Sequence, residues 1–270
     1  MQESSRLSES PWNEHLETAM RAARDAGRRQ LEAFDKPHTV DFKGETNLVT
    51  EVDRACEEAI HGLLRDTFPT HDFLMEETAT QRTDSPFLWV VDPLDGTTNY
   101  THRYPHFCCS IALQHEGRTV VGVVYDPVRR ELFTAIEGAG AFLNGRPIRT
   151  SNEDQLIRCL VATGFPNEIR TARDKNLRKF ARILLLVRSV RRSGSAALDL
   201  CYLAAGRLDG YWVLTLCPWD QAAGILMVEE AGGRVTDPGG KPTHLHSQAL
   251  VASNGRIQEQ LLALLSGKSA

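Results

Sequence analysis

The octapeptide Asp92-Pro-Leu-Asp-Gly-Thr-Thr-Asn99 is built from residues that bind cations and phosphate. Asp92 and Asp95 offer two carboxylates, and Pro93 stiffens the turn between them. We therefore expect both carboxylates and the Leu94 carbonyl to converge on a hard cation such as Mg2+. A polar β-turn would account for any one of these residues, because Asp, Pro, Gly, Thr and Asn all form turns. A turn needs only two or three such residues, so it does not account for all eight in succession after a buried strand.

The element before this loop indicates where such a site would lie. Residues 87–91 form a short, continuous apolar run, which is typical of a strand covered on both faces in a layered α/β protein. Ligands of such sheets bind at the carboxyl ends of strands. Gly96 would let a substrate approach the backbone closely, and the amides near Thr97 would face an anion if a helix starts there.

Further acidic residues could complete a cation site. Glu76 and Glu77 follow residues 72–75, which are expected to form a short strand, although adjacent glutamates are commonly just solvated. Asp53 stands three residues after Thr50 at the start of a helix, where an acid also favours the helix dipole.

Asp220 opens another helix, directly after Pro218 and Trp219. An aspartate at such a position is an ordinary helix cap. The small residues that follow would nevertheless let this helix end pack close to a neighbour, as a carboxylate that reaches a shared metal site requires: Ala222, Ala223 and Gly224.

Together, five acids resemble the pattern of the inositol monophosphatase family of Mg2+-dependent, lithium-sensitive phosphatases: Asp53, Glu76, Asp92, Asp95 and Asp220. The resemblance covers nearly the whole chain. Its most specific motifs are residues 92–99 and Trp-Asp-Gln-Ala-Ala-Gly at 219–224. Weaker motifs at 47–53, 75–78, 138–145 and 230–233 support it.

The resemblance implies an α/β (α+β) fold, namely a layered α/β/α/β/α sandwich of the inositol monophosphatase and fructose-1,6-bisphosphatase type, often a homodimer. It implies hydrolysis of small phosphate monoesters with Mg2+ as cofactor. By position, it implies five oxygen ligands for the metal: Glu76, Asp92, the Leu94 carbonyl, Asp95 and Asp220. Glu76 and Asp53, with Thr97, would orient or deprotonate the attacking water. Gly96 and Thr97 would hold the phosphate.

The chemistry fits these residues without the resemblance. Clustered Mg2+ ions neutralise a phosphate, acidify a water and stabilise the leaving alkoxide. Several carboxylates and one carbonyl suit a hard metal, and no His or Cys pairing suggests zinc.

The substrate side departs from the family pattern. Members that act on inositol phosphates usually carry a glutamate seven residues before the aspartate of the second motif, where it binds inositol hydroxyls. Val213 stands at that position and cannot accept such a hydrogen bond. Gly194, Ser195 and Ala196 match the family's substrate-side segment and would line the alcohol pocket. A strand-to-helix turn with a serine N-cap explains the same three residues.

The surrounding pattern predicts two lobes. The first begins with helices at 12–34 and 52–64 and continues with an antiparallel meander of strands at 107–113, 120–125, 131–135 and 141–143. The second alternates strands near 160 and at 187–191, 210–216 and 249–253 with helices at 175–186, 195–205, 220–231 and 256–265. Lobe 1–150 would carry most metal ligands and the phosphate loop, and lobe 151–270 would supply Asp220 and the alcohol-side pocket. The site is expected in the cleft between them.

Composition narrows the class of protein. A chain of 270 residues with 41% hydrophobic residues can bury a sizeable core. The net charge of -4 argues against a nucleic-acid partner, although Arg188, Arg191 and Arg192 could still contact anions. No apolar run approaches a membrane span and the polar N-terminus is unlike a signal peptide, so we expect no membrane partner and a cytoplasmic location. The six cysteines are expected to be buried free thiols.

The leading hypothesis is a Mg2+-dependent phosphomonoesterase acting on inositol 1-phosphate. Histidinol phosphate, fructose 1,6-bisphosphate or a 3'-phosphonucleotide are alternative substrates. A regulatory binding protein on the same fold is an alternative of another class. The retention of every expected metal ligand and of Thr97 favours the enzyme.

Overall fold

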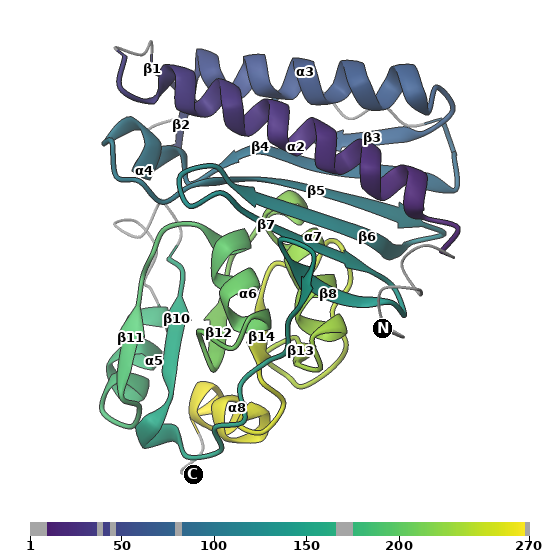
Figure 1. Ribbon diagram of the computed structural model, residues 1–270. Coiled ribbons are helices and arrows are strands. Elements are labelled where there is room, and N and C mark those ends of the chain that lie inside the picture. Colours follow the sequence, from purple (N-terminus) through teal and green to yellow (C-terminus); the bar gives the residue numbers. More distant parts are fainter. Residues whose placement is uncertain (1–9, 37–39, 44–46, 79–82, 166–174, 268–270) are drawn as a thin grey trace.

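Five alternating layers of helix and sheet make up the protein in the computed structural model, which describes residues 10–36, 40–43, 47–78, 83–165 and 175–267 (Figure 1). The layer order is a helix pair, a seven-stranded sheet, a second helix pair, a five-stranded sheet and a third helix pair. This is the layered α/β/α/β/α arrangement that the family resemblance implies.

The first helix pair is α2 (Asn13–Phe34) and α3 (Glu51–Thr67), which lie against each other and cover one face of the large sheet. A short antiparallel hairpin, β1 (Val40–Lys43) and β2 (Asn47–Thr50), connects them. Both helices are amphipathic, and their apolar stripes pack on the sheet because burial of such a stripe stabilises a helix more than its intrinsic propensity does.

The large sheet consists of consecutive strands in chain order, with only the first pair parallel: β3 (Asp72–Met75), β4 (Phe87–Asp95), β5 (Cys108–His115), β6 (Arg118–Asp126), β7 (Glu131–Ile136), β8 (Gly140–Leu143) and β9 (Arg146–Pro147). The predicted antiparallel meander is therefore confirmed. A five-residue helix, α4 (Thr97–Thr101), follows β4. On β4, Trp89 and Val91 face the first helix pair while Val90 faces the middle layer, so both faces are buried as expected.

The second sheet has the strand order β11-β10-β12-β14-β13. Its strands are β10 (Leu160–Thr163), β11 (Ser189–Arg191), β12 (Gly210–Val213), β13 (Arg234–Thr236) and β14 (Leu250–Ser253). A 3-10 turn, η1 (Leu156–Arg158), precedes β10, and the outer helices α5 (Lys175–Leu184) and α8 (Gln258–Ser266) lie against each other. Val161 and Trp212 pack with these outer helices, whereas Val213 faces the middle layer.

The middle layer is formed by α6 (Ala196–Ala204) and α7 (Pro218–Glu230), which contact each other and both sheets. Two glycines allow this close packing. A Cβ on Gly122 of β6 would lie 3.0 Å from the Ala223 carbonyl oxygen, and a Cβ on Gly224 would lie 2.6 Å from Leu200 Cδ1. The small residues of the second motif therefore do bring the start of α7 close to its neighbours.

Two further observations concern sequence-based expectations. Five cysteines are buried free thiols as predicted, but the prediction is wrong for Cys217, which is exposed next to the start of α7. Within the described part of the chain, no helix combines the length and the apolar character needed to cross a membrane.

Candidate metal centre

A register shift in β4 brings Asp92 and Asp95 to one place. Asp92 pairs with Ser110 and Asp95 with Cys108, so β4 uses one residue more than β5 over this stretch. In a regular strand, residues three apart point to opposite faces. The irregularity, with Pro93 inside it, lets both carboxylates serve the same site. The strand was expected to end at residue 91, and it instead continues through Asp95 because the bulge keeps the pairing with β5.

Asp220 reaches the same place from the other half of the sequence. It lies in the first turn of α7, where its carboxylate accepts a hydrogen bond of 2.9 Å from the Cys217 amide. The helix starts at Pro218, two residues earlier than expected. One carboxylate oxygen each of Asp92, Asp95 and Asp220 lies within 4.8 Å of the others, and this is the only such group of potential metal ligands among the described residues.

The electrostatics of this cluster favour a bound cation. Burial, and then the negative charges of Glu76, Asp95 and Asp220, raise the pKa of Asp92 well above its usual range. Burial and the charge of Asp95 raise the pKa of Asp220 to about 7. Buried carboxylates this close together repel one another unless they take up protons or bind a cation.

Asp95 is held by the start of α6. Its Oδ2 accepts hydrogen bonds from the Ser195 hydroxyl at 2.6 Å and from the Ala197 amide at 2.8 Å. Ser195 is also the N-cap of α6, accepting from the Leu198 amide. Ser195 is buried, so its hydroxyl is directed to Asp95. A contact between substrate and residues 194–196 stays a prediction.

Glu76 lies just beyond β3, is half-buried, and its negative charge helps to raise the pKa of Asp92. It is not part of the 4.8 Å group. The structure therefore places Glu76 at the edge of the carboxylate cluster, beside Asp92.

Asp53 and Thr97 meet between α3 and α4. Asp53 forms a capping box with Thr50, accepting from the Thr50 amide at 2.9 Å. Its other carboxylate oxygen lies 3.2 Å from the Thr97 hydroxyl, which is also 3.1 Å from the Leu94 carbonyl oxygen. Burial raises the pKa of Asp53, and the hydrogen bonds from Thr50 oppose that rise. Asp53 is thus a helix cap and a partner of Thr97 at the same time.

The glycines of the predicted phosphate and alcohol sides lie in tight turns. Gly96 has a φ of +101°, and a Cβ there would lie 3.0 Å from the His106 carbonyl oxygen. Gly194 has a φ of +90°, and a Cβ there would lie 2.9 Å from the Asn99 side-chain nitrogen. Both positions exclude other side chains.

Asn99 is a residue whose role the sequence analysis missed. Its side-chain nitrogen donates to the carbonyls of His106 at 2.8 Å and Ser193 at 2.9 Å. It therefore ties α4 to the turn that precedes α6, across 94 residues of sequence. The only feature of the sequence that could have indicated this role is that Asn99 is the last residue of the octapeptide.

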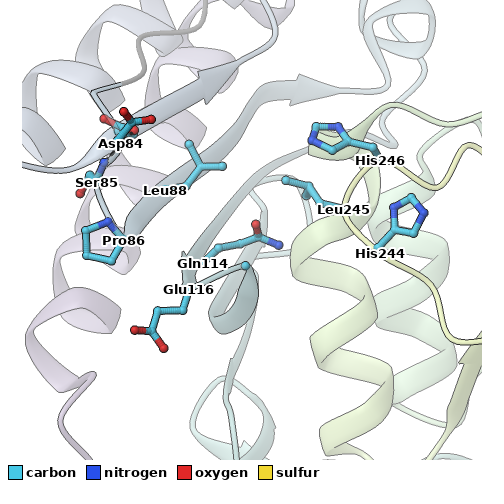
Figure 2. Close-up of a pocket in the computed structure, with 11 residues that line it drawn as sticks. Asp84, Ser85, Pro86, Leu88, Gln114, Glu116, His244, Leu245 and His246 are labelled. Atoms are coloured by element: carbon cyan, nitrogen blue, oxygen red, sulfur yellow. Dashed lines mark hydrogen bonds between the residues drawn. The ribbon is translucent and has the colours of Figure 1, made fainter.

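One cavity in the described part of the structure is lined by none of the predicted site residues. That cavity, of about 510 Å³, opens beyond the other end of β4, where Leu88 and Gln114 lie between the segment of Asp84 and the loop of His244 (Figure 2). The carboxylate cluster is therefore identified by its geometry and charge, and not by cavity size.

Comparisons with known proteins decide the family. The profile of the Inositol monophosphatase family matches residues 12–270. This chain belongs to that family. It is 45% identical over 265 residues to "Inositol monophosphatase 2" of Solanum lycopersicum, covering 94% of this chain and 98% of the relative. It is 44% identical over 251 residues to "Nus factor SuhB" of Escherichia coli, covering 92% and 94%.

A solved structure agrees with the sequence comparisons. The inositol monophosphatase from Anabaena (Nostoc) superimposes with a TM-score of 0.88 at 39% identity, over 96% of this chain and 98% of that one. The family and the fold class predicted from the motifs are therefore confirmed. Membership in this family supports a phosphatase activity on this fold, with a small phosphate-bearing molecule as substrate.

Proposed function

We propose that this protein is a Mg2+-dependent phosphomonoesterase that hydrolyses inositol 1-phosphate and similar small phosphate monoesters by attack of an activated water. The convergence of Asp92, Asp95 and Asp220 from two distant segments within 4.8 Å is the observation that carries the proposal. Such a cluster is costly without a cation. The family resemblance supports the same activity.

The donor set fits Mg2+. Every candidate ligand offers oxygen, and Mg2+ prefers carboxylates and carbonyls to nitrogen or sulfur ligands. The residues that would hold it share this chemistry: Glu76, Asp92, the Leu94 carbonyl, Asp95 and Asp220. When bound, Mg2+ would neutralise the phosphate and make a nearby water a better nucleophile.

The chain's own residues would orient the attack. The Thr97 hydroxyl has Asp53 as a hydrogen-bond acceptor, so Thr97 could accept a hydrogen bond from the water while donating to Asp53. Asp53, with Glu76, would take up the water's proton or hold the water in place. Gly96 and the backbone amides around Thr97 would hold the phosphate, as the family resemblance implies. Gly194, Ser195 and Ala196 would border the alcohol.

Further aspects of this proposal have two sources. The family resemblance implies lithium sensitivity and a homodimer, and the sequence pattern predicts a cytoplasmic location and a division into lobes 1–150 and 151–270. In this division, the first lobe holds most ligands and the second supplies Asp220 and the alcohol side.

The substrate range should be broad. Val213 is buried in the apolar cluster between the sheets, so it offers no hydrogen bond to a polyol. A lost polar partner costs about 1 to 3 kcal/mol of discrimination. We expect inositol 1-phosphate to be favoured by less than about a hundredfold in kcat/KM, as that energy suggests.

Phosphate release from a substrate panel, with Mg2+ and with EDTA, tests the proposal. The panel is inositol 1-phosphate, histidinol phosphate, fructose 1,6-bisphosphate and a 3'-phosphonucleotide. We expect Mg2+-dependent release from more than one compound. Release that continues unchanged in EDTA would contradict the role of the metal.

A regulatory binding role is the second candidate, because a relative of 44% identity is named "Nus factor SuhB". The absence of phosphate release from every compound of the panel, by protein that binds Mg2+, would favour this role over catalysis.

A further inference from the structure

Helix α3 carries a second buried acid for which the proposed mechanism has no use. Asp53 and Glu57 lie one helical turn apart, and each is only 1% exposed, whereas Arg54 and Glu58 on the same helix are exposed. Glu57 is thus buried together with the apolar residues of the helix. A buried carboxylate is costly unless its oxygens accept hydrogen bonds.

The Glu57 carboxylate accepts a hydrogen bond of 2.8 Å from the backbone amide of Glu77. Glu77 directly follows Glu76, the acid beside Asp92 at the edge of the cluster. One turn earlier, Asp53 accepts from the Thr97 hydroxyl. The same face of α3 therefore holds two segments of the site, the bend after β3 and the start of α4.

Glu57 itself is not placed as a metal ligand. It lines a separate cavity of about 320 Å³ together with Arg54, Glu58, His61, Glu77 and Thr78. Within the described part of the chain, the ligand atoms of this set do not come together as those of Asp92, Asp95 and Asp220 do.

We propose that Glu57 is a positioning residue, which fixes the backbone at Glu77 so that Glu76 points its carboxylate to the cation site. This inference rests on the proposed function. Residues that orient metal ligands typically change metal affinity or activity by about 10- to 100-fold when they are altered.

Two conservative substitutions distinguish the effect of the length of the Glu57 side chain from the effect of its negative charge. Glu57→Asp keeps the charge but shortens the side chain by one methylene, so the carboxylate no longer reaches the Glu77 amide. Glu57→Gln loses the charge but keeps an oxygen that can accept from that amide. Glu58→Asp, the same change at the neighbouring exposed position, is the matched control.

The primary measurement is Mg2+ binding to the full-length protein by calorimetry, without substrate, alongside the melting temperature in EDTA. We expect Glu57→Asp to weaken Mg2+ binding by about tenfold or more. Glu57→Gln and Glu58→Asp should bind within about threefold of wild type, a free-energy difference close to RT. In turnover, Glu57→Asp should raise the Mg2+ concentration for half-maximal rate more than it lowers the rate at saturating Mg2+.

A wild-type Mg2+ affinity in Glu57→Asp would overturn the inference. An equal loss of Mg2+ affinity in Glu57→Asp and Glu57→Gln would also overturn it, because it would show that the charge of Glu57 matters and its side-chain length does not. A lowered melting temperature in EDTA with unchanged Mg2+ affinity would make Glu57 a purely structural residue. If wild type bound no Mg2+, the proposed function would fail instead.

Discussion

At the scale of single residues, most acids of the candidate site also accept hydrogen bonds that fix the start of a helix. Asp220 caps α7 through the Cys217 amide, Asp53 caps α3 through Thr50, and Asp95 accepts from the start of α6. Each carboxylate is thus oriented by hydrogen bonds that exist without a cation. If these acids ligate Mg2+ as proposed, the ion would find its ligands already in place, which would reduce the entropy cost of binding.

Asp92→Asn should abolish catalysis and leave the fold intact. The change removes one negative charge from the cluster, and the asparagine oxygen can still accept from the Leu94 amide, as Asp92 does at 2.9 Å. We expect phosphate release to fall by at least about 100-fold, because an essential ligand is lost. The melting temperature in EDTA should stay the same or rise, since repulsion within the cluster falls.

The matched control for this variant is Asp66→Asn, at an exposed position on α3. It should be indistinguishable from wild type in both measurements. A folded Asp92→Asn protein with near-normal turnover at saturating Mg2+ would remove Asp92 from the metal site.

Thr97→Ala should lower kcat more than it raises KM. The Thr97 hydroxyl lies within hydrogen-bond distance of Asp53 and of the Leu94 carbonyl, where it can orient a water. Orientation of a nucleophile matters most in the transition state, so we expect a loss of about 100-fold or more in kcat. Thr97→Ser, which keeps the hydroxyl, should retain most of the activity. Steady-state kinetics decide, and an effect on KM alone would exclude the catalytic role.

At the scale of elements, local patterns predict the helices and strands well, and long-range contacts explain what they miss. The first helix was expected at 12–34 and spans Asn13–Phe34, because its apolar residues recur at helical spacing. The extension of β4 through Asp95 could not be predicted, because it depends on pairing with β5. The short strands β1, β2 and β13 were missed, although the equally short β3, β10 and β14 were predicted.

In the candidate site, too, local sequence motifs could be recognised and long-range contacts could not. The acidic motifs indicated the carboxylates that converge, because their residue types alone limit the chemistry. The links that hold them depend on contacts between distant segments, such as Asn99 with Ser193 and Glu57 with Glu77. A single sequence contains no periodicity that would reveal such pairs.

Gly122→Ala should displace α7 and weaken the site from a distance. Its Cβ would lie 3.0 Å from the Ala223 carbonyl oxygen, a backbone atom that can move only with the helix. We expect a loss of about 1 to 3 kcal/mol in the free energy of unfolding, as for overpacked cores. Mg2+ affinity should fall as well, because α7 carries Asp220.

The same substitution elsewhere provides the control. A Cβ on Gly62 of α3 would meet no atom within 4 Å. Gly62→Ala should therefore stabilise the helix by about 0.5 to 1 kcal/mol and leave Mg2+ binding unchanged. Urea unfolding measures both changes, and a neutral Gly122→Ala would show that α7 adapts without cost.

At the scale of the whole molecule, an aspartate and two histidines with shifted pKa values make stability depend on pH in opposite ways. Burial raises the pKa of Asp220 from 3.8 to about 7, so its stabilising contribution is present at acid pH and is lost as pH rises through about 7. Burial lowers the pKa of His71 and of His106 from 6.5 to about 4. Their contribution is present above pH 6.5 and is lost as pH falls towards 4.

Added Mg2+ distinguishes the effect of the carboxylates on stability from that of the histidines, because it should bind the carboxylates and not the histidines. Protons compete with Mg2+ for these carboxylates, so the rise in melting temperature caused by Mg2+ should be larger at pH 8 than at pH 5. At a concentration about 100 times the dissociation constant, binding adds about 2.7 kcal/mol, or about 5 to 10 °C for a chain of this size. Melting curves with Mg2+ and with EDTA at both pH values measure the difference, and Asp92→Asn should lose most of the rise at pH 8. An equal rise at pH 5 and pH 8 would mean that Mg2+ stabilises the protein at a site other than this carboxylate cluster.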